Sequence, residues 1–183
     1  VSAEFNVPSS WIVGLSFAPD GPGIVWATID VGARSRLWKA TPGKALPPPQ
    51  PLSGSNFFSF AVSSDGRRLV AGDRRGGIQT WDVASGKPGP SFDTGSWVTA
   101  LAISADGRLL AHGRDDGALT VVELTTRRIL LSRHEGPQSI SALAISADGR
   151  LLASADSDSV IKLWEIPEAS TTTATFRSPK TDP

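Results

Sequence analysis

The sequence predicts an all-β protein built from four repeated units, each folded as short antiparallel strands. Three observations predict this architecture. A turn motif ending in Asp-Gly recurs along the chain, a second motif centred on Trp recurs at nearly the same spacing, and short stretches of alternating residues lie between them. Strands are therefore the expected elements through most of the 183 residues.

The turn motif occurs four times and sets the period of the repeat. Residues 101–107 and 143–149 both read LAISADG, whereas residues 60–66 read FAVSSDG and residues 15–21 read LSFAPDG. The four Asp-Gly pairs are separated by 45, 41 and 42 residues. Asp-Gly favours a tight turn between strands, because Gly tolerates positive φ and the Asp side chain can bond nearby backbone groups.

The second motif keeps the same period. It reads SRLWKA around Trp38, IQTWDV around Trp81, LTVVEL around Val122 and IKLWEI around Trp164, at steps of 43, 41 and 42 residues. Since two independent landmarks repeat together, chance is a poor explanation of either one.

Each unit contains a pattern of four strands. Large and small residues alternate from Ala100 to Ser104, which is the period of two expected of a strand. A second strand follows the Asp-Gly turn at once, and a third carries the Trp. Weaker fourth strands are expected at 90–93, 128–132 and 174–177. Four short antiparallel strands in about 40–45 residues are typical of one blade of a β-propeller.

The repeat predicts the division of the chain into blades. The expected boundaries are an outer strand leading into the first blade at 1–10, blade 1 at 11–56, blade 2 at 57–96, blade 3 at 97–138, blade 4 at 139–169, and an outer strand with a flexible tail at 170–183. The proline-rich stretch at 45–56 breaks the spacing and is expected to be an extended link between the first two blades.

These motifs resemble those of the WD-repeat (WD40) family over about residues 11–168. The dipeptide that names the family stands at Trp81-Asp82, degenerate versions stand at Trp38-Lys39 and Trp164-Glu165, and Val122-Glu123 has lost the Trp. The resemblance implies β-propeller blades and a role in docking proteins rather than in catalysis.

Many WD blades share a buried polar tetrad of Trp, Ser or Thr, His and Asp. In the fourth unit the resemblance assigns these roles to His134, Ser154, Asp158 and Trp164. The other units have lost members: His112 and Ala71 stand in two of the Ser places. We therefore expect these blades to depend on packing more than on polar networks.

Partners of this family often bind at the entrance of the first strand and just before the tetrad Asp. The positions that match in this chain, and so are the predicted partner-binding residues, are Trp11, Trp97, Ser139, Arg74, Asp115 and Ser157, together with Asn56 and Val31. Exposed Trp and Arg are over-represented at binding hot spots. The alternative interpretation is that each Trp simply caps the end of its blade.

Composition argues against several kinds of chemistry. Cysteine is absent and only two histidines occur, which argues against thiolate or imidazole metal sites. The 18 basic residues balance the 18 acidic ones, so no global charge favours nucleic acid or an anionic membrane. The carboxylate pairs, Asp115-Asp116 and Asp156/Asp158, fall at turns where the family commonly has Asp. We predict no catalytic residue, no metal and no cofactor.

The predicted function is a non-catalytic protein–protein interaction scaffold or docking module, in the cytoplasm and within a larger signalling protein. The alternatives are a propeller that binds a small ligand or acts as a hydrolase through a central channel, and a propeller that binds nucleic acid. Because the chain starts without Met and has an outer strand predicted at each end, we expect part of a larger propeller. Further blades of a parent chain or a second copy would complete it; a self-closed ring of four blades is the alternative.

Overall fold

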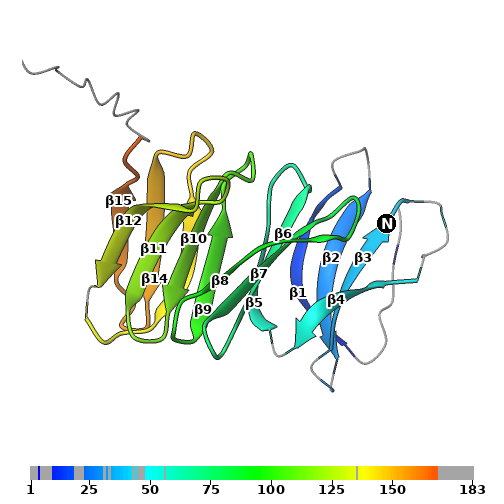
Figure 1. Ribbon diagram of the computed structural model, residues 1–183, viewed down its shortest axis with the longest axis horizontal. Helices are drawn as coiled ribbons and strands as arrows, with labels where there is room; N and C mark the ends of the chain where they lie inside the picture. The colour runs from blue at the N-terminus through cyan, green and yellow to red at the C-terminus, as the bar shows by residue number, and fades with distance from the viewer. Residues whose placement is uncertain are drawn as a thin grey trace, which may run out of the picture.

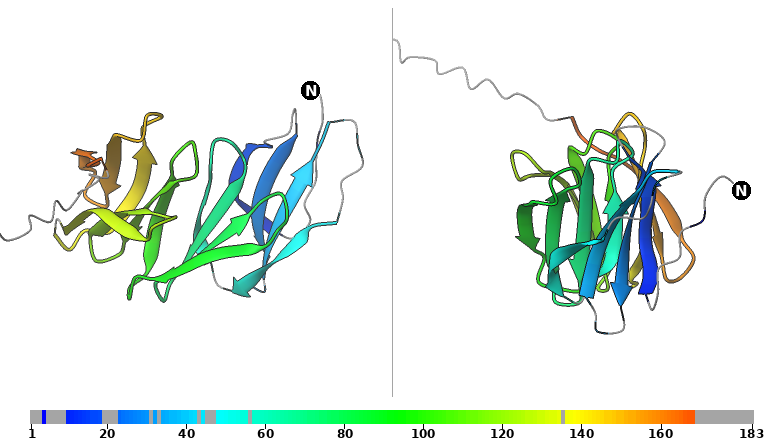
Figure 2. Two further views of the ribbon diagram at one scale, coloured as in Figure 1. Left: turned by 45° about the horizontal axis from the view of Figure 1, so that its top comes forward. Right: turned by 90° about the vertical axis from the view of Figure 1, so that its right-hand side faces the viewer.

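The computed structural model describes residues 4, 10–18, 23–30, 32, 34–42, 44, 48–55, 57–134 and 136–168. These residues form fifteen strands in four antiparallel sheets, which follow one another along the long axis of the molecule (Figure 1). Seen along that axis the sheets overlap one another (Figure 2). The described residues contain no helix that could span a membrane.

Within every sheet the strands pair in chain order. The sheets consist of β1 (Ser10–Phe17), β2 (Ile24–Asp30), β3 (Arg34–Ala40) and β4 (Gln50–Ser55); β5 (Phe57–Val62), β6 (Arg68–Asp73), β7 (Gly77–Asp82) and β8 (Pro88–Asp93); β9 (Val98–Ile103), β10 (Leu109–Arg114), β11 (Ala118–Glu123) and β12 (Arg128–His134); β13 (Ile140–Ile145), β14 (Leu151–Asp156) and β15 (Ile161–Glu165). The predicted all-β class with propeller-type blades is confirmed, and we call the four sheets blades 1 to 4.

The proline-rich stretch differs from its prediction. The extended link expected at 45–56 is wrong for residues 50–55, which form β4, the fourth strand of blade 1, and pair with β3. Pro51, opposite Arg36, has no N–H to donate, and β4 accepts it because it is the edge strand of its sheet. The strands expected within 1–10 and at 174–177, and the tail at 170–183, fall outside the described residues apart from Glu4 and Ser10.

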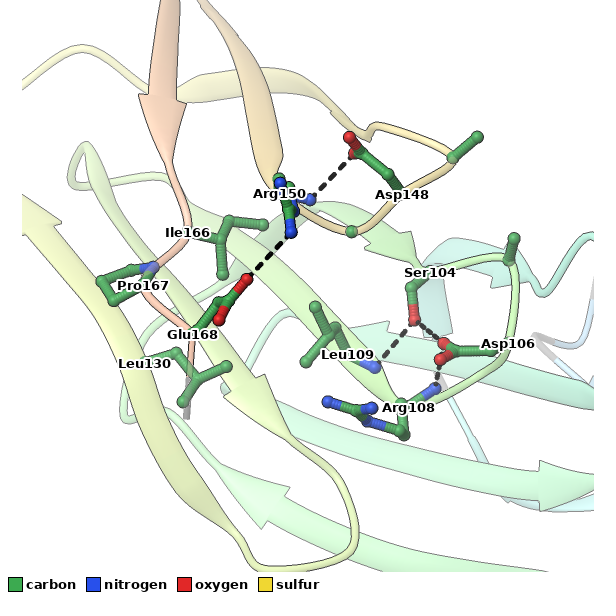
Figure 3. Close-up of a pocket in the computed structure, with 13 residues that line it drawn as sticks. Ser104, Asp106, Arg108, Leu109, Leu130, Asp148, Arg150, Ile166, Pro167 and Glu168 are labelled. Carbon is green, nitrogen blue, oxygen red and sulfur yellow. Dashed lines mark hydrogen bonds and ion pairs between the residues drawn. The ribbon is translucent and has the colours of Figure 1, made fainter. Parts of the chain in front are cut away.

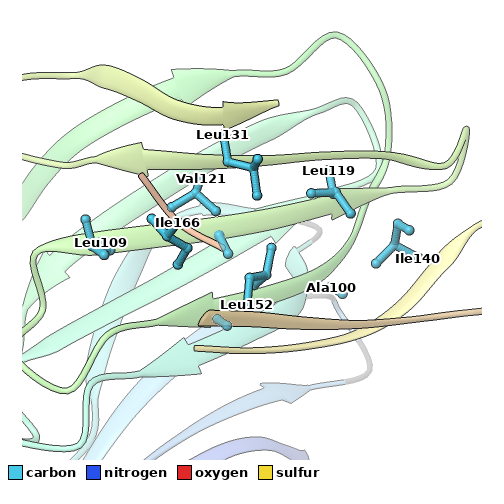
Figure 4. Packing of buried hydrophobic residues seen from close by; sticks show 10 residues of the cluster. Ala100, Leu109, Leu119, Val121, Leu131, Ile140, Leu152 and Ile166 are labelled. Carbon is cyan, nitrogen blue, oxygen red and sulfur yellow. The ribbon is translucent and has the colours of Figure 1, made fainter. Parts of the chain in front are cut away.

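Apolar packing joins each blade to the next. Three clusters of buried side chains lie at the three boundaries between consecutive blades. At the boundary of blades 3 and 4 (Figure 4), the residues that meet are Leu109, Leu119 and Val121 of blade 3 with Ile140, Leu152 and Ile166 of blade 4. Burying a side chain of this size stabilises a fold by about 1.5–3 kcal/mol, so these boundaries are the principal source of stability.

A β-bulge in each first strand sets which side chains face the preceding blade. The pairing of β5 with β6 shifts register between Phe57 and Ser59, and β1, β9 and β13 shift at the equivalent position. The extra residue brings positions three apart onto one face. Phe57, Phe60 and Val62 therefore all pack against the cluster shared with blade 1.

The Ser-x-Asp-Gly sequence forms the turn between the first and second strands. In blade 3, Ser104 Oγ donates to Asp106 Oδ1 at 2.6 Å and accepts the Leu109 N–H at 2.9 Å, while Asp106 Oδ1 accepts the Arg108 N–H at 3.0 Å. Gly107 has a φ of 69°. Blades 2 and 4 repeat these hydrogen bonds, so the recurring sequence encodes a recurring turn.

Close packing between blades predicts a large effect of Gly113→Ala. A Cβ at Gly113 would lie 2.4 Å from Cγ2 and 2.6 Å from Cβ of Ile140, which is buried in the boundary of blades 3 and 4. We expect the free energy of unfolding to fall by about 1–3 kcal/mol, because an overpacked boundary must shift. Urea denaturation measures the change.

Gly14→Ala is the matched control, since that strand glycine would place its Cβ 3.4 Å from the nearest side-chain atom, an ordinary contact. A loss in Gly14→Ala as large as that in Gly113→Ala would contradict the role of close approach.

Candidate functional site

Those predicted partner-binding residues that the structure describes gather at one end of the blades. This end, which we call the loop face, carries the starts of the first strands and the turns between second and third strands, at residues 73–77, 94–98, 114–118, 136–140 and 156–160. Because strands alternate in direction, the Ser-x-Asp-Gly turns lie at the opposite end, the Asp-Gly face. Loops on a rigid sheet frame commonly carry binding residues.

An arginine held between two aromatic rings lies at the boundary of blades 2 and 3. The Arg74 guanidinium carbon lies 4.0 Å from the ring centroid of Phe58 and 4.8 Å from that of Trp97. The two rings meet edge to face, with centroids 6.3 Å apart. We call these three residues the Arg74 cluster. Arg74 and Phe58 are exposed, and stacking of this kind orients a guanidinium without using its N–H groups.

The Arg74 side chain makes no hydrogen bond or ion pair with any described residue. A guanidinium has five N–H donors in a planar fork that matches a carboxylate. These donors are therefore available to an acceptor outside the chain.

Asp115 fixes the loop that carries Trp97. Ser96 Oγ donates to Asp115 Oδ1 at 2.5 Å, and the Asp115 N–H donates to the Trp97 carbonyl at 3.1 Å. In the same turn, Arg114 pairs with Asp116 and donates to the Thr94 carbonyl. The structure thus brings Arg74, Trp97 and Asp115 into one region of the loop face.

The remaining predicted partner-binding residues lie outside this region. The Ser157 N–H donates to the Ser139 carbonyl at 2.9 Å, which joins these two residues within blade 4. Trp11 is exposed on β1 of blade 1 and belongs to neither group. Asn56 and Val31 fall outside the described residues.

The predicted tetrad of blade 4 forms only in part. Trp164 Nε1 donates to Ser154 Oγ at 2.9 Å, so these two members meet. The other two assignments are wrong. His134 Nε2 lies 2.8 Å from the Asp116 carbonyl oxygen, because His134 ends β12 opposite Ala118 and its ring reaches the turn of blade 3.

Asp158, the fourth assigned member, is an exposed turn residue. Its N–H donates to Asp156 Oδ1 at 3.0 Å, and the same oxygen accepts the Val160 N–H at 3.0 Å. Asp73 plays the same part in blade 2, accepting the N–H groups of Arg75 and Gly77 at 2.8 Å each. The residue that organises this turn therefore precedes the assigned position by two.

The surviving polar element is an indole hydrogen bond between third and second strands. Trp38 Nε1 donates to Thr28 Oγ1 at 2.9 Å in blade 1, at the ten-residue separation seen for Trp164 and Ser154. In blade 2 the residue ten positions before Trp81 is Ala71, which has no hydroxyl to accept the hydrogen bond. The buried Trp81 Nε1 has no hydrogen-bond partner among the described residues.

Blade 3 places a buried histidine at this position. His112 is 8% exposed, and its Nδ1 lacks a hydrogen-bond partner in the described part of the chain. Burial, followed by the nearby positive charge of Arg114, lowers the pKa of His112 from 6.5 to about 4. The ring is therefore neutral at physiological pH.

A pocket of about 470 Å³ opens on the Asp-Gly face between blades 3 and 4 (Figure 3). Asp106 and Asp148 line it. Each carboxylate accepts a hydrogen bond from the serine hydroxyl of its turn, Ser104 or Ser146, and this hydrogen bond lowers the pKa of the carboxyl. Arg150, also in the lining, pairs with Glu168 at 3.0 Å. These carboxylates and this guanidinium are already engaged within the protein. Among the described residues, no three His, Asp or Glu side chains gather where they could hold a metal ion.

Comparison with known proteins agrees with this architecture. Residues 86–121 and 126–165 match the family model "WD domain, G-beta repeat". No curated protein matches the chain. Of 1580 matching chains of solved structures, one is the crystal structure of the computationally designed Ika4 protein, with a TM-score of 0.70 and 21% sequence identity over 90% of this chain and 96% of that chain. At this identity the likeness concerns the fold alone.

The chain is therefore an all-β array of propeller blades. Residues 86–121 and 126–165 match the WD40 repeat model, which agrees with the resemblance found in the sequence. WD40 domains typically serve as scaffolds that bind proteins and are generally non-catalytic.

The unpaired indole of blade 2 predicts that Ala71→Ser stabilises the protein. A hydroxyl at residue 71 would stand where Ser154 and Thr28 accept indole hydrogen bonds, and would satisfy Trp81 Nε1. We expect the free energy of unfolding to rise by about 1 kcal/mol, the usual gain from pairing a buried donor. Chemical denaturation measures it.

Ala111→Ser is the matched control. Ala111 is fully buried at the neighbouring position of β10, and blade 3 has Val122 in place of the Trp. The control is expected to bring no gain, and an equal gain in both variants would argue against an indole hydrogen bond.

His112 predicts a loss of stability between about pH 6.5 and pH 4. The folded pKa is about 4 and the unfolded value about 6.5, so the unfolded chain binds more protons within this window. The contribution is fully present above pH 6.5 and is lost as pH falls toward 4, by at most about 3 kcal/mol. Urea midpoints across this range report it.

His112→Thr should flatten this dependence, since Thr28 occupies the same place in blade 1. His134→Gln serves as the control, because His134 is exposed, and should leave the dependence intact. A profile in which the two variants behave alike would refute the assignment to His112.

Proposed function

We propose that this chain is a non-catalytic scaffold that docks protein partners on its loop face through the Arg74 cluster. The observation that carries the proposal is the exposed Arg74 guanidinium, stacked on Phe58 and Trp97 and without an acceptor among the described residues. Trp and Arg are the residues most enriched at hot spots, where they work best when packing has already oriented them.

The cluster favours an acidic peptide segment as its ligand. A carboxylate can accept two parallel hydrogen bonds from the Arg74 fork, and the exposed ring of Phe58 offers an apolar surface beside it. The Ser96–Asp115 pair forms a polar margin, as at the rim of many interfaces. The segment would bind across the boundary of two blades, which a single repeat could not provide.

The two alternatives have less support. A ligand-binding or hydrolytic channel calls for converging polar groups, and the carboxylates of the Asp-Gly face pocket are engaged in their turns. Nucleic-acid binding calls for a basic field, and the net charge of this chain is zero.

The test selects ligands from a random-peptide library displayed on phage, with the full chain as bait. We expect the selected peptides to contain Asp or Glu, and Arg74→Ala to weaken their binding at least about tenfold, as the loss of a hot-spot arginine does. Fluorescence anisotropy of the synthetic peptides measures the affinity.

Arg75→Ala is the matched control, because Arg75 is an exposed arginine of the same turn that contacts neither ring. This variant should bind the peptides as tightly as the unsubstituted chain does. Thermal melts show whether each variant is folded. The docking proposal fails if selection yields no peptide, or if the peptides bind both variants equally well.

A further inference from the structure

Both ends of the row of blades expose apolar side chains. On β1 of blade 1, Ile12, Leu15 and Phe17 are 61%, 65% and 72% exposed. On blade 4, Leu151, Ile161 and Leu163 are 41%, 75% and 71% exposed. Blades 1 and 4, which carry these two sets, lie at opposite ends of the long axis (Figure 1). We call them the leading face and the trailing face.

The leading face repeats a surface that the other blades bury. The Asp-Gly pair and the bulge align Ile12, Leu15 and Phe17 with one set of three in each later blade. These sets are Phe57, Phe60 and Val62 in blade 2; Val98, Leu101 and Ile103 in blade 3; and Ile140, Leu143 and Ile145 in blade 4. Each set packs against the blade before it, and only blade 1 has no described blade in that place.

The trailing face repeats the opposite surface. Leu151, Ile161 and Leu163 align with Leu109, Leu119 and Val121 of blade 3. Those three are buried in the cluster that blade 3 shares with blade 4. The same surface of blade 1 contributes Val25, Ala27 and Leu37 to the cluster shared with blade 2.

The chain itself thus shows that a leading face fits a trailing face, because it makes this contact at three internal boundaries. A second copy of the chain carries the same two apolar faces, each able to pack on its counterpart. Because the net charge of the chain is zero, two copies do not repel each other.

We infer that two copies of this chain close an eight-bladed ring, in which the trailing face of each copy packs on the leading face of the other. Two identical contacts of this kind, related by a two-fold axis, leave neither face exposed. Eight blades lie within the range found for propellers. The inference is independent of the docking at the Arg74 cluster, because the two surfaces share no residue.

Light scattering of the 183-residue chain over a range of concentrations tests the inference. We expect twice the chain mass of 19.2 kDa. Leu15→Glu damages the leading face and Leu163→Glu the trailing face. Each variant alone should be a monomer, since both contacts of its homodimer contain one damaged face.

Mixing the two variants distinguishes this ring from other dimers. The intact trailing face of Leu15→Glu can pack on the intact leading face of Leu163→Glu, so the mixture should form a one-to-one dimer. A dimer built from two leading faces would instead persist in Leu163→Glu alone. Ile129→Glu is the matched control: Ile129 is 60% exposed on β12, belongs to neither face, and its variant should remain dimeric.

Circular dichroism melts confirm that each variant is folded, which is expected because the substituted side chains are largely exposed. If the unsubstituted chain stays monomeric and melts cooperatively, the inference is overturned and the two faces belong to other partners. Open-ended oligomers, or a dimer that survives in both single variants, would overturn it as well.

Discussion

The packing of one blade against the next is the constraint on which the rest of this structure depends. Every internal blade is apolar on both faces of its sheet, so neither face can be satisfied without a neighbour. This requirement explains the bulge in each first strand, which gathers three apolar residues on one face. It also explains the glycine at 113, where the side chain of Ile140 fills the space that a Cβ would occupy.

The polar interactions of the turns are local and set their geometry, whereas a few side chains, such as Ser59 and Thr99, donate to backbone carbonyls of the next blade. The Ser-x-Asp-Gly turns and the aspartates of the loop-face turns bond backbone groups within a few residues of themselves. The one long polar contact of the tetrad type, between Trp and a hydroxyl residue, survives in blades 1 and 4 and has lost its acceptor in blade 2. A stiff frame built in this way leaves the loop-face side chains free to vary, and the Arg74 cluster lies among them.

The sequence was sufficient to predict the features that repeat. The period, the four blades and the Asp-Gly turns follow from motifs that recur at fixed spacing. Resemblance also pointed to Arg74, Trp97 and Asp115, but as separate positions. Phe58 was missed because strict alternation does not reveal a bulge, and the residue displaced by the bulge is Phe58 itself. That displacement depends on how two strands pair, which no single strand encodes.

The wrong assignments have physical causes of the same kind. His134 precedes blade 4 in the sequence, which is why the resemblance assigns it there. In the structure His134 is the last residue of β12 and pairs with Ala118, so its ring contacts the turn of blade 3. The resemblance assigns Asp158 to the tetrad, but Asp156 stands in the same turn, and only hydrogen-bond geometry shows that Asp156 organises it. The prolines predict an extended link at residues 50–55, which instead form β4. An edge strand tolerates proline because one of its sides has no neighbouring strand that needs an N–H donor.

The pairing of strands in chain order has a consequence for how such a chain folds and changes. Within each blade, strands that are adjacent in the sheet are also adjacent in the sequence. Their contacts therefore have low sequence separation, and forming them costs little loop-closure entropy. Cooperativity must then arise between blades, where the apolar clusters lie, as in a one-dimensional array with nearest-neighbour coupling. Duplicating or deleting one complete repeat would leave the strand pairing within every remaining blade unchanged. The number of blades is thus a quantity that evolution can alter without redesigning any of them.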